Sequence, residues 1–331
     1  MTPGAATPPD VTVSIVNTNN RELLLACLES LEADRSRRRV SVEVVVLDNA
    51  SEDGSVDAVR GRFPEVRVLA QERRAGFGAN HNAVIRASSG RYVYVLNDDT
   101  TSDDWGLDEL VAYLDARPEV GALGPRLVYP DGLPQASAWR FPTPVAGAVG
   151  ALTLGKVGLV QSRGSEPRRV DWVTAAAMLL PRRVLDQVGL FDERFFIYSE
   201  ETDLCLRIGQ AGHEIHWYPG VTVVHHVGQT AVKVPERRIN EFWRSRHRYW
   251  SKHHSPLVAR TAALLWGLPY AVRAAGAAAV LRLPEGRRPL SVRLTPAELR
   301  LHARDAWRVG GPGLRELAED FNARAPGARS G

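Results

Sequence analysis

The feature that most constrains this chain is a regular alternation of short apolar runs and helix-like segments between residues 11 and 97. The apolar runs are rich in β-branched residues and lie at residues 11–15, 42–47, 66–69 and 91–96. Between them, apolar side chains recur at helical spacing, as Leu24, Leu28 and Leu31 do. Strands that alternate with helices predict a parallel sheet covered on both faces. The sequence therefore predicts an α/β fold with a mainly parallel central sheet.

Polar clusters follow three of the four predicted strands. They are Asn17-Thr18-Asn19, Asp48-Asn49 and Asn97-Asp98-Asp99. Ligands of open α/β sheets bind outside the carboxyl ends of the strands, so three such clusters favour a binding site over plain turn chemistry. Side chains alternate along a strand, so Asn97 and Asp99 are expected to share a direction while Asp98 points away. Asn19, three residues before Glu22, also resembles a helix N-cap with a capping box.

The chain lacks the glycine motifs that usually hold phosphate. No GxGxxG follows the first predicted strand and no GxxxxGK[ST] is present, so a dinucleotide site and a P-loop have no support. A bound phosphate would need another source of positive charge. A divalent cation, Mg²⁺ or Mn²⁺, held by Asp99 would supply it, because these ions take hard oxygen ligands.

A second dense group of charged and aromatic residues lies at 191–226. Glu200, Glu201 and Asp203 begin a predicted helix, where the helix dipole favours negative charge. The dipole accounts for one acid, but burial of a carboxyl group beside aromatic rings also raises its pKa toward that of a general base. His225 ends a predicted strand beside a second histidine, and only one of two adjacent strand residues is expected to face a given site.

Composition limits the class of protein to which this chain can belong. The 331 residues are 44% hydrophobic and 24% charged, as in a soluble globular protein, and the net charge of +4 does not require an anionic partner. Cys27 and Cys205 lie far apart without metal-ligand spacing, which favours a reducing cytoplasm. Residues 1–10 are expected to be a disordered lead-in rather than a signal peptide. No uncharged apolar run reaches about 18 residues, so no transmembrane helix is predicted.

The last part of the chain departs from the strand–helix alternation. Residues 133–168 are rich in Gly, Pro and Ala and are predicted to form a long loop. Residues 237–254 mix aromatic with basic residues, which fits an amphipathic helix, contact with anionic lipid, or nucleic-acid binding, the last without a recognised motif. In the lipid interpretation, a weakly apolar helix at 257–281 lies on the bilayer. Residues 319–331 are predicted to be a flexible tail.

Five segments, taken in order, resemble inverting family 2 glycosyltransferases of the GT-A fold. They are SIVNTNNRELLLACLESL, VVVLDNASEDGS, RAGFGANHN, YVLNDDT and VGLFDERFFIYSEETDLCLRIGQAGHEIHWYPGVTVVHH. The likeness runs from about Val11 to about Thr230 and is greatest to the rhamnosyltransferase-like branch that builds bacterial envelope polysaccharides. Each segment is a weak signal alone, but five at sensible spacings are typical of that family.

The resemblance implies a role for the charged residues. Asp99 would bind the divalent cation that bridges the donor diphosphate, with Asn97 in place of the first acid of a DxD-type motif. His225 would be the second protein ligand. Glu201 would be the general base, in a place more often held by Asp. The neighbouring acids Glu200 and Asp203 would position the acceptor or the helix.

The resemblance also implies a set of substrate contacts. Asn17, Asn19 and Asp48 would line the nucleoside pocket, with Asp48 accepting from the pyrimidine N3–H. The other expected contacts are Asn49, Arg74, Asn80, Asn97, Asp98 and Trp172. Thr18 stands where the family usually has an aromatic ring that stacks on the base, and Ala175 replaces a usual glycine near the acceptor.

The implied organisation is a GT-A domain followed by helices. The domain spans 11–235, with a nucleotide-binding half at 11–104 and an acceptor half at 105–235, and the helical extension spans 236–318. We expect transfer of a sugar, first L-rhamnose from dTDP-rhamnose, to an envelope polysaccharide or a polyprenyl-linked acceptor. The setting is the cytoplasm, with peripheral contact to the inner face of the plasma membrane, and nucleic acid is not an expected partner. The alternatives are another UDP-, GDP- or dTDP-hexose or a galactofuranose donor, or a catalytically silent sugar-nucleotide-binding subunit of a glycan assembly complex.

Overall fold

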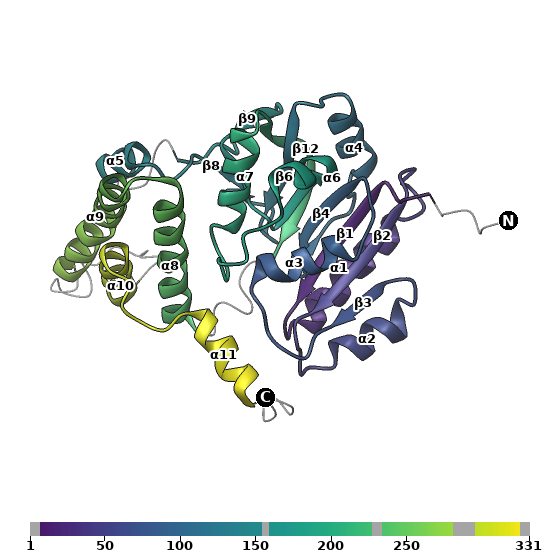
Figure 1. Ribbon diagram of the computed structural model, residues 1–331, viewed down its shortest axis with the longest axis horizontal. Coiled ribbons are helices and arrows are strands. Elements are labelled where there is room, and N and C mark those ends of the chain that lie inside the picture. The colour runs from purple at the N-terminus through teal and green to yellow at the C-terminus, as the bar shows by residue number, and fades with distance from the viewer. Residues whose placement is uncertain (1–6, 154–158, 227–233, 281–294, 325–331) are drawn as a thin grey trace.

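A computed structural model describes residues 7–153, 159–226, 234–280 and 295–324. An α/β part built on a large sheet lies beside a group of helices that come mostly from the C-terminal third of the chain (Figure 1). The predicted combination of an α/β fold with a helical C-terminal part is confirmed.

Four parallel strands form one side of the sheet. They are β1 (Val11–Asn17), β2 (Val42–Asp48), β3 (Arg67–Ala70) and β4 (Tyr92–Asn97). The strand order is β3-β2-β1-β4-β11-β6-β12-β5. The strands that complete it are β5 (Thr100–Thr101), β6 (Val120–Val128), β11 (Ala177–Pro181) and β12 (Glu214–His225). β11 is antiparallel to both of its neighbours, whereas β6 and β12 are parallel to each other.

Helices connect the strands much as the apolar spacing predicts. They are α1 (Arg21–Asp34), α2 (Ser55–Arg62), α3 (Phe77–Arg86), α4 (Leu107–Asp115), α6 (Arg182–Val188) and α7 (Glu200–Gln210). The predicted capping box at Asn19 is wrong, because α1 begins after Asn20 and that residue makes no side-chain cap bond. Asn19 instead has a left-handed backbone, and its Oδ1 accepts from the Glu52 amide at 2.6 Å. Asn19 therefore stabilises the turn that follows β2.

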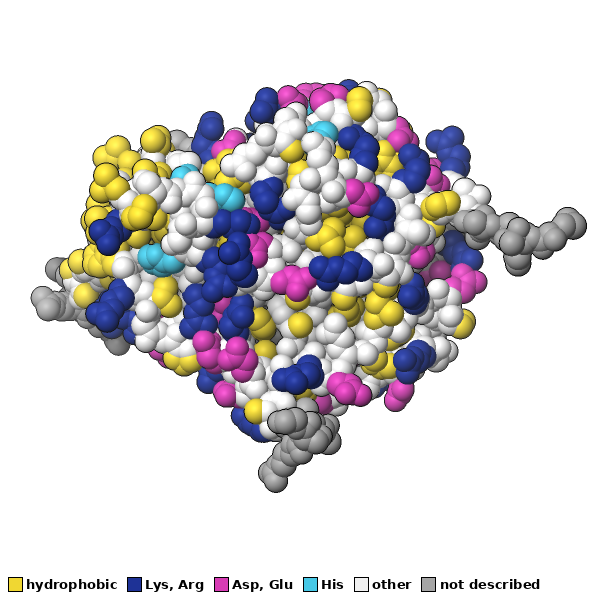
Figure 2. All heavy atoms as spheres, viewed as in Figure 1, with side chains coloured by type: hydrophobic (Ala, Val, Ile, Leu, Met, Phe, Trp, Pro, Cys, Tyr) yellow, Lys and Arg dark blue, Asp and Glu magenta, His cyan; other side chains and the backbone are white. Residues whose placement is uncertain are grey.

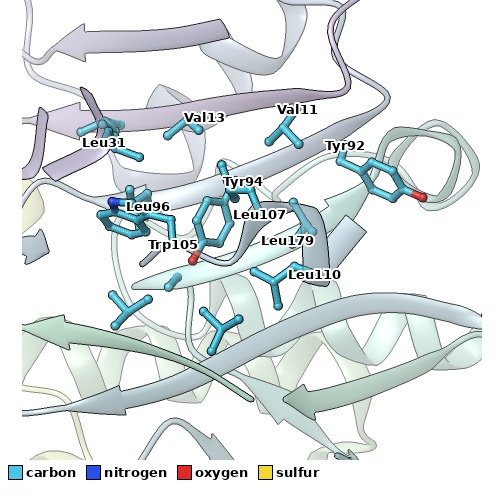
Figure 3. Packing of buried hydrophobic residues seen from close by; sticks show 14 of the residues in the cluster. Val11, Val13, Leu31, Tyr92, Tyr94, Leu96, Trp105, Leu107, Leu110 and Leu179 are labelled. Carbon is cyan, nitrogen blue, oxygen red and sulfur yellow. The ribbon is translucent and has the colours of Figure 1, made fainter. Parts of the chain in front are cut away.

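One apolar cluster holds β1 and β4 against α4 (Figure 3). Val11 and Val13 of β1 and Tyr94 and Leu96 of β4 are completely buried there. The Tyr94 ring meets the Trp105 ring edge-on, with centroids 6.3 Å apart. Full burial of one such side chain stabilises the fold by roughly 1.5–3 kcal/mol. The polar residues that follow β4 are therefore fastened to a rigid base.

Residues 133–168, predicted to be a loop, include short strands and one helix in their described part. They contain β7 (Pro134–Gln135), β8 (Ala138–Trp139), α5 (Pro144–Leu152) and the start of β9 (Arg168–Val170). Thr143 caps α5 by accepting from the Ala146 amide at 3.2 Å. A Cβ at Gly147 would lie 2.6 Å from the Trp266 ring, so the small residues of α5 serve close packing. The Gly- and Ala-rich composition predicted a loop, but packing against Trp266 stabilises the helix despite its low helix propensity. Residues 154–158 lie outside the described range.

The C-terminal extension consists of four helices. They are α8 (Pro235–His253), α9 (Pro256–Val280), α10 (Pro296–Trp307) and α11 (Leu314–Arg324). Trp243, Tyr249 and Trp250 of α8 are at most 1% exposed, which agrees with the amphipathic-helix interpretation of residues 237–254. Their cluster also contains Phe195 of the α/β part, so the extension is packed on the rest of the molecule.

The structure tests two further expectations, one about the C-terminal tail and one about membrane-spanning helices. Residues 319–324, predicted to lie in the flexible tail, are the last turns of α11, and residues 325–331 lie outside the described range. None of the helices in the described part of the chain is long and apolar enough to cross a membrane.

Candidate active site

A pocket of about 480 Å³ lies where the strand ends meet α7, α8 and α11. Its polar lining consists of Thr18, Asn20, Asn49, Arg74, Asn80, Asn97, Asp98, Asp99, Thr174, Tyr198, Glu200, Glu201, His225 and Arg238. The volume is in the range of sites for small molecules and cofactors. Asn97 and Asp99 after β4 and the acid Glu201 therefore share one cavity, although they lie far apart in the sequence.

The loops after β1 and β2 are fastened to one another by side-chain amides. Asn17 Nδ2 donates to Asp48 Oδ2 at 2.9 Å, and the Ser51 amide donates to Asp48 Oδ1 at 2.9 Å. Asn49 Oδ1 accepts from the Ala75 amide at 2.8 Å, which ties the start of α3 to the end of β2. These bonds make the strand-end wall of the pocket a rigid surface.

Gly76 allows the segment that contains Phe196 to approach the start of α3. The Phe77 amide, the first of α3, donates to the carbonyl of Phe196 at 2.7 Å. A Cβ on Gly76 would lie 2.5 Å from that same carbonyl oxygen, which is too close for any side chain. The RAGFGANHN segment therefore joins the two halves of the pocket by a backbone contact.

His225 faces the residues that follow β4 because β5 pairs antiparallel with the end of β12. Its Nε2 lies 3.2 Å from Asp99 Oδ1 and 3.2 Å from Asn97 Nδ2. Its Nδ1 lies 3.1 Å from Gln135 Oε1. An Nδ1–H that donates to Gln135 leaves the lone pair on Nε2, facing the pocket. Asn97 and Asp99 thus share a direction, as side-chain alternation predicted.

This donor set fits a divalent cation. Asp99 Oδ1 is buried, and apart from its approach to His225 it has no hydrogen-bond partner among the described residues. A carboxylate oxygen and an imidazole nitrogen suit Mn²⁺, and Mg²⁺ accepts the carboxylate. Within the described residues, no three His, Cys, Asp or Glu side chains are grouped to hold a metal by themselves. Substrate oxygens or water would have to complete the coordination.

Asp98 also lines the pocket, although strand alternation predicted that it points away. Its carboxyl group hydrogen-bonds to the Asn20 side chain and the Thr18 backbone. Burial, and after it the charge of Asp99, raises the pKa of Asp98 to about 8. The turn after β4 breaks the strand geometry, which is why alternation fails at this residue.

The acids at the start of α7 are presented by a strained turn. Tyr198 and Ser199 both have left-handed backbones, with φ of 69° and 66°. Such a conformation costs roughly 1–3 kcal/mol for a residue other than glycine, so the surrounding packing must enforce it. The turn directs Glu200 and Glu201 into the pocket at the first turn of α7.

Both acids have an environment that favours the protonated form. Burial, followed by the charge of Glu201, raises the pKa of Glu200 well above its usual range. Burial also raises the pKa of Glu201, and the positive charge of Arg246 opposes that effect. One oxygen of each carboxyl group is buried without a hydrogen-bond partner among the described residues. A carboxylate of raised pKa that faces a cavity is suited to accept a proton.

Arg246 of α8 supplies the opposing charge from the helical extension. Its side chain is buried between the rings of Phe242 and Trp266, whose centroids lie 5.3 Å and 5.8 Å from its Cζ. Its Nε and Nη1 have no hydrogen-bond partner among the described residues, and burial lowers the pKa of the guanidinium. A buried cation without a bonded acid acts on Glu201 through space.

The last helix closes the pocket over Arg74. The Arg74 amide donates to Asn322 Oδ1 at 2.7 Å, and Asn322 Nδ2 donates to the Arg74 carbonyl at 2.9 Å. The Arg74 guanidinium lies over the Phe321 ring, with Cζ 3.6 Å from the centroid. Leu314 and Leu317 of the same helix line the pocket. α11 thus connects the extension to the nucleotide-binding half.

Five residues predicted to contact substrate lie outside the pocket lining, and their predicted role stays a prediction. Asn17 and Asp48 are buried and bonded to each other, and the exposed Asn19 accepts from the Glu52 amide, so all three hold the strand-end loops. Trp172 stacks on Trp139 with centroids 4.6 Å apart.

The fifth of these residues is Asp203, which is fully buried and joins α7 to α8. It forms ion pairs with Arg207 (2.9 Å) and Lys252 (2.6 Å), and its Oδ1 lies 2.6 Å from His253 Nε2. Of its two predicted roles, this geometry agrees with positioning of the helix.

Several residues in or next to the pocket, Arg246 among those that do not line it, escaped the sequence analysis. Arg238 and Arg246 belong to the basic and aromatic segment of α8, whose composition was noted but whose direction was unknown. Leu314, Leu317 and Ala318 recur at helical spacing, a signal that would have predicted α11. Nothing in the sequence indicated that this helix returns to Arg74.

Comparisons with known proteins show the family and the fold of this chain. The sequence model of the family described as "Glycosyltransferase like family 2" matches residues 8–251. The N-acetylglucosaminyl-diphospho-decaprenol L-rhamnosyltransferase of Mycobacterium tuberculosis is 32% identical over 270 residues, which cover 75% of this chain and 85% of the relative. The rhamnosyltransferase WbbL of Escherichia coli K12 is 23% identical over 233 residues, which cover 65% of this chain and 83% of the relative.

Two solved structures share the fold. The mannosyltransferase PcManGT of Pyrobaculum calidifontis, in complex with GDP-Man and Mn²⁺, matches with a TM-score of 0.58 and 20% identity over 91% of this chain and 88% of that chain. GalNAc-T7 with UDP, GalNAc and Mn²⁺ matches with a TM-score of 0.53 and 14% identity over 97% of this chain and 59% of that chain. At these identities the likeness is one of fold.

Proposed function

Because this chain belongs to the glycosyltransferase-like family 2 and is a glycosyltransferase with the predicted GT-A fold, we propose that it transfers a sugar from a nucleoside-diphosphate donor to an acceptor hydroxyl with inversion. One observation supports this reaction most directly. Glu201, a carboxylate suited to accept a proton, lines the same pocket as the Asp99–His225 pair, whose donor set fits a divalent cation.

The proposed step needs one base and no covalent intermediate. Glu201 takes the proton of the acceptor hydroxyl while that oxygen forms a bond to the anomeric carbon of the donor. The bond from the anomeric carbon to the phosphate oxygen breaks, and its electron pair leaves with the nucleoside diphosphate. Attack opposite the leaving group inverts the anomeric centre.

The charge of the leaving diphosphate has to be balanced. Asp99 and His225 would hold Mg²⁺ or Mn²⁺, and when bound the ion would supply positive charge toward the diphosphate oxygens. Gln135 would orient His225 through its 3.1 Å contact to Nδ1, which leaves Nε2 to the ion. Arg74 and Arg238, which also line the pocket, would add further positive charge near the donor.

The relatives suggest which substrates to test first. The mycobacterial relative is named for transfer of L-rhamnose to N-acetylglucosaminyl-diphospho-decaprenol, and the E. coli relative is also a rhamnosyltransferase. We therefore propose dTDP-L-rhamnose as the donor and a polyprenyl-diphosphate-linked sugar, a precursor of cell-envelope polysaccharide, as the acceptor. Another hexose or a galactofuranose donor is the second candidate.

The decisive variant is Glu201→Gln, which keeps the shape of the side chain and removes the base. With dTDP-L-rhamnose and a short-chain acceptor, we expect kcat to fall by about 10²–10⁴-fold, the usual contribution of a general base. The Kd of the donor, measured by calorimetry, should stay within about twofold, because the base acts on the acceptor. Glu22→Gln, at a side chain that is 90% exposed, is the matched control.

The same experiment separates the alternatives. Turnover by Glu201→Gln within a few-fold of the wild type would remove Glu201 as the base. Donor binding by the wild type without turnover on any acceptor would favour the silent nucleotide-sugar-binding subunit. Turnover with another nucleotide sugar but not with dTDP-L-rhamnose would keep the reaction and correct the donor.

A further inference from the structure

An exposed apolar stripe runs along α9. Leu257, Leu264, Leu268 and Val272 are 75%, 60%, 44% and 49% exposed. Their spacings of seven, four and four residues place them on one face of the helix. The opposite side is core, where Ala262 is completely buried. α9 is therefore apolar on both sides, and only one side has a partner within the described structure.

Neighbouring helices extend the stripe on both flanks. On α5, Val145 and Leu152 are 72% and 87% exposed, and α5 packs against α9 through Gly147 and Trp266. On α10, Trp307 is 47% exposed, and its indole Nε1 lies 3.4 Å from the backbone oxygen of Leu264.

The resulting surface is continuous and is called the apolar face below. It consists of Val145, Leu152, Leu257, Leu264, Leu268, Val272 and Trp307. Yellow side chains gather over α5 and α9 in the space-filling view (Figure 2), and none of the residues of the face lines the active-site pocket. Seven of the ten exposed large apolar side chains in the described part of the chain belong to it, so these residues are concentrated rather than scattered. A concentrated exposed apolar patch marks an interaction surface.

Charge on α5 and α9, the two helices that carry most of the apolar face, is of one sign. Arg260 and Arg273 of α9 are both exposed, and neither forms an ion pair with another described residue. The sequences of α5 and α9 contain no Asp or Glu. A face that combines apolar side chains, arginines and a boundary tryptophan matches the interfacial region of an anionic bilayer, where each of these groups is favoured. Two copies of this chain would instead oppose arginines to arginines.

We propose that the apolar face docks the protein on the surface of an anionic lipid bilayer. α5, α9 and α10 would lie in the interface, with Leu264 and Leu268 among the acyl chains and Arg260 at the headgroups. This docking goes beyond the proposed reaction and depends on neither its donor nor its base.

The link to the active site is α8. Arg238 near its start lines the pocket, and its other end leads directly into α9. Because α8 and α9 share a buried cluster, docking would hold the pocket at a set distance from the bilayer. The benefit, access to a lipid-linked acceptor, rests on the proposed function.

Vesicle sedimentation of the full chain tests the docking directly. We expect binding to vesicles of phosphatidylcholine with about 30% phosphatidylglycerol and weaker binding to pure phosphatidylcholine. Leu264→Glu should lower the partition coefficient at least about tenfold, because a charge would enter the apolar region. Leu133→Glu is the matched control, since Leu133 is 61% exposed but lies far from the face in a turn, and it should bind within about twofold of the wild type.

The other outcomes are equally informative. Arg260→Glu with Arg273→Glu should weaken binding to the anionic vesicles only. Failure of the wild type to sediment with either vesicle, or unchanged binding by Leu264→Glu, would overturn the docking. A wild-type dimer that Leu264→Glu converts to a monomer, without vesicle binding, would assign the face to a second copy.

An activity measurement keeps this proposal distinct from the reaction. Leu264→Glu should leave turnover of a short-chain soluble acceptor unchanged and reduce turnover of the same sugar carried on polyprenyl diphosphate in vesicles. Reduced turnover of both acceptors together with a lowered Tm would show that Leu264→Glu disturbs folding, and the result for this variant would then count against the docking. Binding to vesicles without any transfer would retain the docking and contradict the proposed function.

Discussion

At the ends of β1 and β2, polar side chains bond to each other, whereas on the α7–α8 side of the pocket three charged groups are left without full partners. Asn17 and Asp48 are joined by a hydrogen bond of 2.9 Å, and Asn49 is used to hold the loop before α3. Across the cavity, Glu200 and Glu201 each have a buried oxygen that lacks a hydrogen-bond partner among the described residues, as do two nitrogens of Arg246.

This difference suggests a division of labour. Satisfied hydrogen bonds make a rigid surface whose shape is set before a ligand arrives, which suits recognition of a donor. Buried charges without partners are costly, and they persist at functional sites because their altered pKa values are useful. The comparison predicts that changes on the first side alter binding, whereas changes on the second alter the pH dependence of turnover.

Asp99→Ala would break the comparison most severely, because the buried Oδ1 of Asp99 approaches His225 and has no other partner among the described residues. We expect metal-dependent transfer to fall by about 10²–10³-fold, the usual cost of losing one electrostatic contact to a leaving group. Titration with Mn²⁺ in the presence of donor should show that the stimulation by metal is lost. Asp103→Ala, at an exposed position of the same loop, is the control. Full activity of Asp99→Ala in the presence of EDTA would exclude this residue as a metal ligand.

Arg246→Met tests whether the helical extension tunes the base. Burial raises the pKa of Glu201, and hydrogen bonds from backbone amides and the charge of Arg246 oppose it; removing that charge should therefore raise the pKa further. Glu201 works only when deprotonated, so the acid limb of kcat/KM should move to higher pH. We expect a loss of roughly tenfold at about pH 6 and a smaller loss at about pH 8.

The control for this variant is Arg248→Met on the same helix, because Arg248 is half-buried and is not among the charges that act on Glu201. Its acid limb should coincide with that of the wild type. An unmoved acid limb in Arg246→Met, with an unchanged Tm, would mean that the two groups are not coupled.

Asn322→Ala should have the smallest effect. Two hydrogen bonds to the backbone of Arg74 are lost, each worth about 1 kcal/mol net, and α11 should open more often. We expect the KM of the donor to rise about two- to fivefold with kcat unchanged, and proteolysis near residue 313 to become faster. Glu319→Ala, exposed on the same helix, should do neither. An unchanged KM and an unchanged rate of proteolysis would show that α11 does not contribute to the donor site.

Local pattern predicted the α/β part well, for physical reasons. The side chains that a strand or helix buries recur every second residue or at i, i+4, a pattern that is visible within a short stretch of sequence. The apolar spacing therefore predicted β1, α1, β2 and β4. The strand-end position of Asn97 and Asp99 followed from the same spacing. Prediction failed where structure depends on partners far along the chain. The small residues of α5 form a helix because Trp266 packs on them, and α11 is ordered by Arg74.

The sequence by itself determined which residues carry charge and where along each strand or helix they occur. From that alone it indicated the parallel sheet, the acids after β4 and the acids at the start of α7. Tertiary structure alone decided which of these charges share a cavity and which are neutralised. Asp203 lies outside the pocket lining, in contact with Arg207, Lys252 and His253. Glu201 lines the pocket, and the charge of Arg246 acts on it without a hydrogen bond. The physical reason is that burial and Coulomb interaction depend on distance in space, and β5–β12 pairing and the packing of α8 set those distances between residues that the sequence keeps far apart.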